Sequence, residues 1–99
     1  MTSRRLIVSP RGLRALESAR GWWRRNRDKA PAAFDDDVEE AFSHVVEQPF
    51  NGVESRDRRG RRTRRVLAER IRYYIYYRVT DDAVEVLTIW HASRRPPRL

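Results

Sequence analysis

The sequence contains no cysteine and only one lysine, Lys29, among its 99 residues. Without cysteine the chain can form neither a disulfide nor a thiolate-ligated zinc site, so packing and hydrogen bonds must stabilise its fold. This absence is typical of a reducing compartment, and we expect the protein in the cytoplasm. The apolar runs are far shorter than the roughly 18 residues of a membrane-spanning helix, and no secretion signal is recognisable. We therefore expect no contact with a membrane.

The chain is short enough that aromatic residues have to supply much of its core. We expect residues 1–99 to form one domain, and a domain of this length buries only about 60–65% of its unfolded surface. Three Trp, four Tyr and three Phe are available for this core. The order and spacing of these aromatics therefore become the main guide to the fold.

The sequence has 14 acidic residues against 22 basic residues, so the formal net charge is +8 and the pI is about 11.1. Such a balance points to a polyanionic or acidic partner, either nucleic acid or an acidic protein. Almost all the positive charge is arginine, which grips phosphate and carboxylate through two parallel hydrogen bonds. A genome rich in G and C would also favour arginine codons, so composition alone leaves the cause of the bias open.

The charges are segregated along the chain. Residues 4–29 hold nine basic residues, whereas residues 31–54 hold seven acidic residues and neither Lys nor Arg. Residues 56–72 then hold nine arginines against two acidic residues. This last run is long and dense enough that we interpret it as a binding surface, with a merely solvated face as the alternative.

The first half of the chain predicts one short strand and two helices. Residues 4–9 have the composition of a strand, and Ser9-Pro10 has the N-cap and first-position residues of a helix over about 10–27. A second helix is expected from near Pro31 to a point before Pro49, because its apolar residues recur at helical spacing. Residues 28–31 are the short link of this helical hairpin. The acidic residues at 35–37 suit the positive end of the second helix dipole.

The second half predicts three strands, at residues 61–68, 72–79 and 83–90, which are rich in aromatic or β-branched residues. The element order is therefore β-α-α-β-β-β. We expect an α+β fold in which the helical hairpin packs on one face of a small, mainly antiparallel sheet.

The last two strands predict a hairpin with Asp81-Asp82 as its two-residue loop. This register pairs Val79 with Val84, Arg78 with Glu85, and so on to Arg72 with His91. Side chains alternate across a strand, so the pairs divide between two faces. The face expected under the helices carries Tyr73, Ile75, Tyr77, Val79, Val84, Val86, Thr88 and Trp90. The opposite face is expected to carry Arg72, Tyr74, Tyr76, Arg78, Glu85, Leu87, Ile89 and His91.

This second face supplies the candidate site. A histidine can act as general acid or base and an arginine can hold a phosphate, so His91 and Arg72 are the candidate catalytic residues. Tyrosines can stack bases and arginines can hold phosphates, which is typical of a nucleic-acid surface. The candidate binding residues are Arg65, Tyr74, Tyr76, Arg94 and Arg95. We expect no metal and no cofactor. The alternative is that the tyrosines are core residues and the histidine is structural.

The chain as a whole resembles the RelE/ParE superfamily of type II toxin–antitoxin toxins. The likeness runs from Leu6 to about Arg95 and is carried by "WWRRNRDKAPAAF", by "EQPFNG", and most specifically by "RYYIYYRVTDDAVEVLTIWHASR". The resemblance implies a toxin that blocks growth and is neutralised by a cognate antitoxin in a hetero-oligomer. It also implies that the antitoxin lays an acidic or amphipathic segment on the arginine-rich surface.

The resemblance leaves two cellular targets open. The RelE-like branch cleaves mRNA at the ribosome without a metal, and typically keeps an arginine where this chain has Tyr74. Arg65, Arg95 and His91 lie near basic positions of that branch, but the "WHASR" ending also resembles ParE-like members, which inhibit DNA gyrase. We favour the ParE-like activity or an undefined target. An mRNA endoribonuclease is the first alternative, and a non-toxic basic nucleic-acid-binding module is the second.

Overall fold

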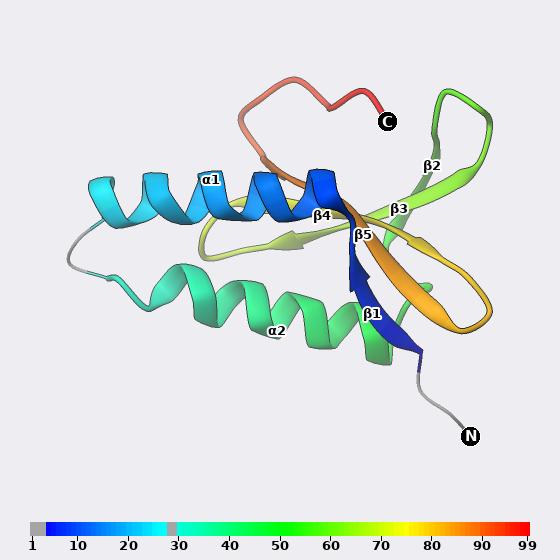
Figure 1. Cartoon of the computed structure of the whole chain (residues 1–99), viewed down its shortest axis with the longest axis horizontal. Helices are drawn as coiled ribbons and strands as arrows, with labels where there is room; N and C mark the ends of the chain where they lie inside the picture. Colours follow the sequence, from blue (N-terminus) through cyan, green and yellow to red (C-terminus); the bar gives the residue numbers. More distant parts are fainter. Residues whose placement is uncertain (1–3, 28–29) are drawn as a thin grey trace.

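The computed structural model describes residues 4–27 and 30–99, and in these it confirms the α+β fold with two helices on one face of a sheet (Figure 1). The elements are β1 (Arg5–Val8), α1 (Pro10–Asn26), α2 (Ala33–Glu47), β2 (Val53–Arg56), β3 (Arg62–Ala68), β4 (Tyr73–Val79) and β5 (Ala83–His91). One strand, β2, is additional to those expected. The link predicted at 28–31 falls partly outside the described residues.

The sheet has the strand order β1-β5-β4-β3-β2, so β1 and β2 form its two edges. β1 runs parallel to β5, and every other neighbouring pair is antiparallel. β2 has a single apolar residue, Val53, and all four of its residues are exposed. It is a strand because its backbone pairs with β3, not because of an apolar pattern, which explains why the sequence did not predict it.

The core lies between the helical hairpin and the sheet. Trp23 of α1 and Phe34 of α2 have ring centroids 6.2 Å apart, and Phe34 meets the ring of Tyr73 edge-on at 5.9 Å. Tyr77 is fully buried, and its hydroxyl donates to the carbonyl of Pro49 at 2.8 Å. Neither helix of the described residues combines the length and the apolar character that crossing a bilayer requires.

The start of α1 is as predicted and reaches into the sheet. Ser9 is the N-cap, and its hydroxyl accepts the amide of Gly12 at 3.0 Å. The same hydroxyl donates to the carbonyl of Leu87 in β5 at 3.0 Å, and the Ser9 amide donates to the carbonyl of Val86 at 2.9 Å. One residue therefore joins the helix to two successive carbonyls of a central strand.

The predicted register of the β4–β5 hairpin is right near the loop and wrong farther out. Val79 with Val84, Arg78 with Glu85 and Tyr77 with Val86 pair as expected. A bulge then leaves Leu87 without a partner, so Tyr76 pairs with Thr88. From this point every residue of β5 faces the opposite side from the one predicted, whereas the faces of β4 are as predicted. Thr88 and Trp90 lie on the open face, the face without helices, and Ile89 and His91 lie on the helix-covered face.

Asp37 of α2 fixes the turn that leads into β4. Its side chain is buried, and one carboxylate oxygen accepts the backbone amides of Arg70 and Ile71 at 2.9 and 3.1 Å. Its neighbours Asp35 and Asp36 are exposed in the first turn of the helix. One member of the predicted acidic run thus has a tertiary role that charge patterning alone did not reveal.

Replacing Asp37 with alanine should lower the free energy of unfolding by about 2–4 kcal/mol, because two amides near the core lose their acceptor. Urea unfolding monitored by tryptophan fluorescence measures this change. Asp36→Ala is the matched control, since it removes an exposed carboxylate from the same turn, and it should cost well under half as much. Equal losses in the two variants would contradict the assigned role of Asp37.

Candidate functional site

The open face of the sheet brings together three of the predicted binding residues. The guanidinium carbon of Arg65 lies 4.8 Å from the ring centroid of Tyr74, and the rings of Tyr74 and Tyr76 are 6.1 Å apart. Arg65 on β3 is also the cross-strand partner of Tyr76. An arginine stacked on a tyrosine presents a flat, cationic surface that suits bases, phosphates or carboxylates.

Trp90 extends this surface toward the end of β5, although the sequence placed it under the helices. It pairs with Tyr74, and the guanidinium carbon of Arg94 lies 3.7 Å from its ring centroid. The indole nitrogen donates to the carbonyl of Arg95 at 2.6 Å. The bulge is what brings Trp90 to this face, so simple alternation could not find it. We define Arg65, Tyr74, Tyr76, Trp90 and Arg94 as the open-face cluster.

His91 does not join the open-face cluster, which corrects the sequence prediction. It lies opposite Tyr73 on the helix-covered side, with the two rings edge-to-face at 5.1 Å. Its Nδ1 accepts the backbone amide of Ser93 at 3.1 Å and is 2.7 Å from the hydroxyl of Ser93. The bulge at Leu87 shifts the alternation by one residue and so moves His91 to the other face.

Arg72 is also not where the sequence placed it. It precedes β4 in the turn after β3 and has a φ of 63°, a backbone conformation that is uncommon for a residue with a side chain. Its amide donates to the carbonyl of Ala68, and its carbonyl accepts the amide of Ala92. The predicted Arg72–His91 pair across the hairpin is therefore wrong, since β4 begins at Tyr73 and it is Tyr73 that faces His91.

Tyr73 and His91 line a small pocket beside α1, together with Trp90 and Arg94 of the open-face cluster. Burial raises the pKa of the Tyr73 hydroxyl above its ordinary value, and the nearby positive charge of Arg94 opposes this shift only in part. The hydroxyl is consequently protonated at neutral pH. Both side chains thus face the helix-covered side of the sheet and meet the open-face cluster at its Trp90–Arg94 end.

The segment after β5, at residues 96–99, lies over part of the open face. The carbonyl of Arg98 accepts from the Arg11 guanidinium at 2.8 Å, and an oxygen of Leu99 accepts the amide of Arg58 at 3.1 Å. A pocket of about 480 Å³ lies between residues 96–99 and strands β2 to β4. Tyr76 lines this pocket and is only 7% exposed, so it presents too little of its ring to stack a base.

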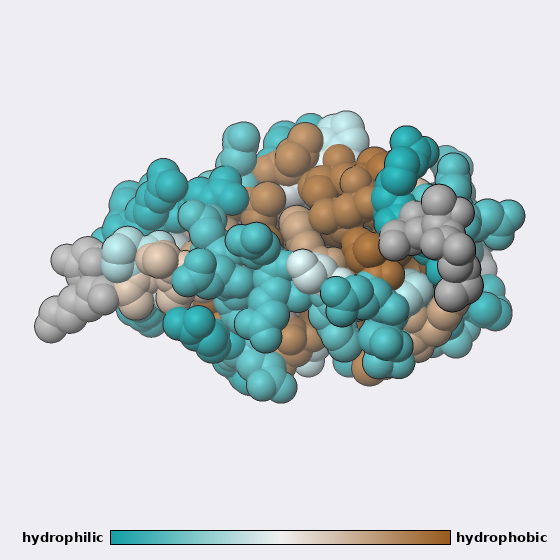
Figure 2. Space-filling view, turned by 90° about the horizontal axis from the view of Figure 1, so that it is seen from below, coloured by the Kyte–Doolittle hydropathy of each residue, from teal (hydrophilic) through white to brown (hydrophobic). Residues whose placement is uncertain are grey.

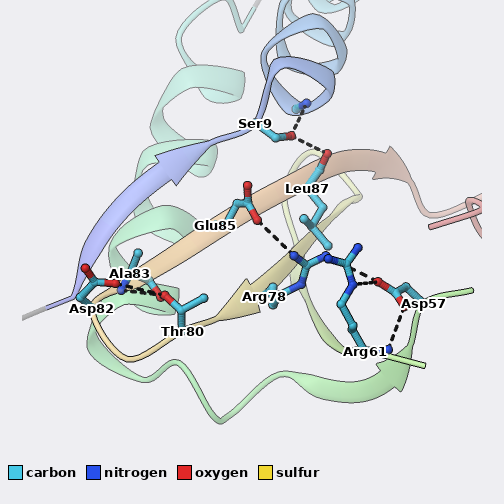
Figure 3. A network of polar contacts seen from close by, with 10 residues as sticks. Ser9, Asp57, Arg61, Arg78, Thr80, Asp82, Ala83, Glu85 and Leu87 are labelled. Atoms are coloured by element: carbon cyan, nitrogen blue, oxygen red, sulfur yellow. Dashed lines mark hydrogen bonds and ion pairs between the residues drawn. The ribbon is translucent and has the colours of Figure 1, made fainter. Parts of the chain in front are cut away.

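An ion-pair network ties β4 and β5 to the loop between β2 and β3 (Figure 3). The predicted Arg78–Glu85 pair is confirmed, with a shortest distance of 3.4 Å. Arg78 also lies 3.6 Å from Asp57, whose carboxylate accepts the backbone amides of Arg59 and Arg61 and the Arg61 guanidinium at 2.8–2.9 Å. Burial opposes ionisation of Asp57, but these hydrogen bonds outweigh it, and the pKa of this carboxyl lies below its ordinary value.

Across residues 4–27 and 30–99, no three His, Asp or Glu side chains gather as a metal site. In the open-face cluster, Tyr74 and Trp90 are suited to stacking and Arg65 and Arg94 to charge-assisted hydrogen bonds, whereas Tyr76 is buried. The arrangement is that of a binding surface. The residue expected to transfer protons lies on the other side of the sheet.

Comparison with known proteins agrees with this fold. The family described as "ParE toxin of type II toxin-antitoxin system, parDE" matches residues 6–96 of the chain. A solved structure titled "Chromosomal ParDE TA system from P. aeruginosa" contains a similar chain, with a TM-score of 0.72 and 17% sequence identity. The match covers 92% of this chain and 98% of the other. Among curated proteins, a search for relatives found no match.

The depressed pKa of Asp57 predicts a specific loss of stability in acid. Because this pKa is below its unfolded value of about 3.8, the ionised carboxylate stabilises the fold above that pH, and the contribution is lost as the pH falls through the folded-state pKa. Asp57→Asn should therefore be less stable than the wild type at neutral pH, with a difference that shrinks well below pH 3.8.

Urea unfolding of both proteins over this pH range tests the expectation. Asp82→Asn is the control, because Asp82 is an exposed carboxylate at the β4–β5 loop and its partner Arg5 is exposed as well. A gap between wild type and Asp57→Asn that stays constant from neutral to acid pH would rule out the linkage.

Proposed function

Because the chain belongs to the ParE toxin family of type II toxin–antitoxin systems, we propose that it blocks bacterial growth by inhibiting DNA gyrase and is neutralised by a cognate antitoxin. The family match over residues 6–96 supports the role of toxin. The choice of gyrase over mRNA rests on a different observation, the position of His91.

Metal-independent RNA cleavage needs a base for the 2′-hydroxyl, an acid for the leaving oxygen and cations for the phosphorane charge. The open-face cluster offers cations in Arg65 and Arg94. The carboxylates of Glu54 and Asp57, which line the pocket beside Arg65, are ion-paired with arginines. His91 is instead paired with Tyr73 and bonded to Ser93. Ribonucleases of the RelE-like branch typically have an arginine at the position of Tyr74. In this chain the position holds a tyrosine, whose ring lies against the guanidinium group of Arg65. These contacts support binding to a target without hydrolysis.

The antitoxin has a separate apolar surface available. A groove of about 640 Å³ lies between α1, α2 and β1, and we call it the apolar groove. Its apolar lining is Leu6, Leu16, Val38, Phe42 and Val46. Figure 2 shows an area of apolar side chains on this side of the molecule, between polar borders. Leu6 is 38% exposed, which is large for an aliphatic residue on a short edge strand.

We propose that an amphipathic helix of the antitoxin fills the apolar groove with its apolar face. Glu39 and Glu47 border the groove and favour basic residues at the edges of that helix, whereas Asp35 is paired with Arg20 on the same border. This placement differs from the arginine-rich surface that the resemblance implied, because the arginine run 56–72 contributes no residue to the groove. An acidic segment of the antitoxin suits that run instead.

Expression of the chain in a susceptible bacterium should arrest growth, induce the DNA-damage response and leave mRNA intact. His91→Ala should remain toxic, because His91 is not part of the open-face cluster. Growth curves, a DNA-damage reporter and primer-extension analysis of mRNA measure the three responses. Rapid mRNA cleavage that disappears in His91→Ala would instead establish a ribonuclease, and normal growth at high expression would reject the toxin function.

Leu6→Glu should remain toxic alone but escape neutralisation, because a charge in the apolar groove opposes docking of an apolar helix face. Co-expression with the antitoxin encoded beside the toxin, followed by growth measurement and co-purification, tests this. Val53→Glu makes the same chemical change at a 59% exposed position on β2, so it should stay neutralised. Neutralisation of Leu6→Glu to the same degree as Val53→Glu would place the antitoxin elsewhere.

A further inference from the structure

The loop end of the β2–β3 hairpin forms an arginine-rich projection that the open-face cluster and the apolar groove do not include. Figure 1 shows this hairpin reaching away from both helices. Its seven residues, 56–62, contain five arginines and one acidic residue. We call this segment, Arg56–Arg62, the arginine hairpin.

The arginine hairpin is held in one conformation by its own hydrogen bonds. Asp57 donates its amide to the carbonyl of Arg61 at 2.8 Å and accepts the amide of Gly60 at 2.9 Å. Gly60 has a φ of 80°, a conformation that glycine adopts at no steric cost. The Asp57 carboxylate accepts two further amides and the Arg61 guanidinium. A loop fixed in this way loses little conformational entropy when it binds a ligand.

Most of the positive charge of the arginine hairpin faces solvent, whereas its negative charge does not. The side chain of Asp57 is only 4% exposed, because it points into the network with Arg61 and Arg78. Arg58 and Arg59 are exposed, and their guanidinium groups form no ion pair with any residue described in the structure. A ligand that approaches the tip therefore meets the guanidinium groups of Arg58 and Arg59, whereas Arg61 is paired with Asp57 and Arg62 with Glu54.

The composition of the hairpin favours phosphate over protein as its ligand. Residues 54–65, with the sequence "ESRDRRGRRTRR", contain no apolar side chain. A stable protein interface needs a buried apolar centre, usually built around aromatic anchors, and this segment has none. Arginine guanidinium groups match phosphate oxygens in charge and geometry, and such contacts need no apolar surface.

We propose that the arginine hairpin binds the phosphate backbone of duplex DNA without sequence preference. A two-stranded β-ribbon fits the major groove of B-form DNA, which is about 12 Å wide, whereas the major groove of duplex RNA is too narrow for it. Arginines on both sides of the ribbon then contact the phosphates of the two strands. This binding does not require that the chain inhibit growth, so it can be present even where the proposed toxin activity is not.

The double variant Arg58→Gln/Arg59→Gln tests the proposal with purified protein and a short fluorescent DNA duplex. Fluorescence anisotropy gives the dissociation constant between roughly 50 and 200 mM salt. Each lost phosphate contact should reduce the slope of log K against log salt by about 0.9, so the double variant should be shallower by about 1.8. Arg58→Lys/Arg59→Lys keeps both charges and should retain most of the slope.

Arg24→Gln/Arg25→Gln is the matched control, because it removes two exposed arginines from the end of α1 and changes the net charge equally. It should bind DNA nearly as tightly as the wild type. An equal loss in the two glutamine variants would show diffuse attraction by net charge and overturn the proposal. Equal or tighter binding to single-stranded DNA or to an RNA duplex would overturn the assignment to duplex DNA.

Discussion

Ser9 is the residue through which the start of α1 is bonded to the bulged part of β5. Its amide and hydroxyl bond two successive carbonyls of β5, those of Val86 and Leu87, while the same hydroxyl caps α1. Two adjacent carbonyls of a regular strand point in opposite directions, so one residue can reach both only where the strand is bulged. Gly12 allows this closeness, because a Cβ there would lie 3.0 Å from the Val86 carbonyl. The first turn of α1 and the bulge in β5 are therefore joined by the hydrogen bonds of Ser9.

The bulge decides which residues can act together. Without it, His91 would share a face with Tyr74 and Tyr76, and the hairpin would combine a proton-transfer group with stacking and cationic groups. With it, Trp90 takes that place and His91 turns toward Tyr73. One extra residue in β5 thus turns the imidazole away from Arg65, Tyr74 and Tyr76, and leaves it beside Arg94 at the end of the cluster.

Most of the fold could be predicted from local sequence patterns, because most of its caps, helices and turns depend on residues that are neighbours in the sequence. The N-cap at Ser9, the helix predicted over about 10–27 and found at Pro10–Asn26, and the loop at Asp81-Asp82 each follow from capping, periodicity or turn chemistry. The strand at 53–56 and the bulge at Leu87 depend on distant partners, β3 and Ser9, and no local pattern marks either. For the same reason, Tyr74 and Tyr76 on regular β4 lie on the predicted face, whereas His91 and Trp90, beyond the bulge, were exchanged.

The sheet topology keeps the proposed binding surfaces apart. β1, which borders the apolar groove, and β2, which carries the arginine hairpin, are opposite edges of the sheet. An antitoxin helix in the apolar groove therefore leaves the arginine hairpin uncovered, and neutralisation by that helix cannot work by competing with phosphate. Neutralisation then requires that other parts of the antitoxin cover the open face or block the toxin sterically from its target. An acidic antitoxin segment that also reaches the hairpin would displace DNA as well, so the extent of the antitoxin decides whether the neutralised complex still holds DNA.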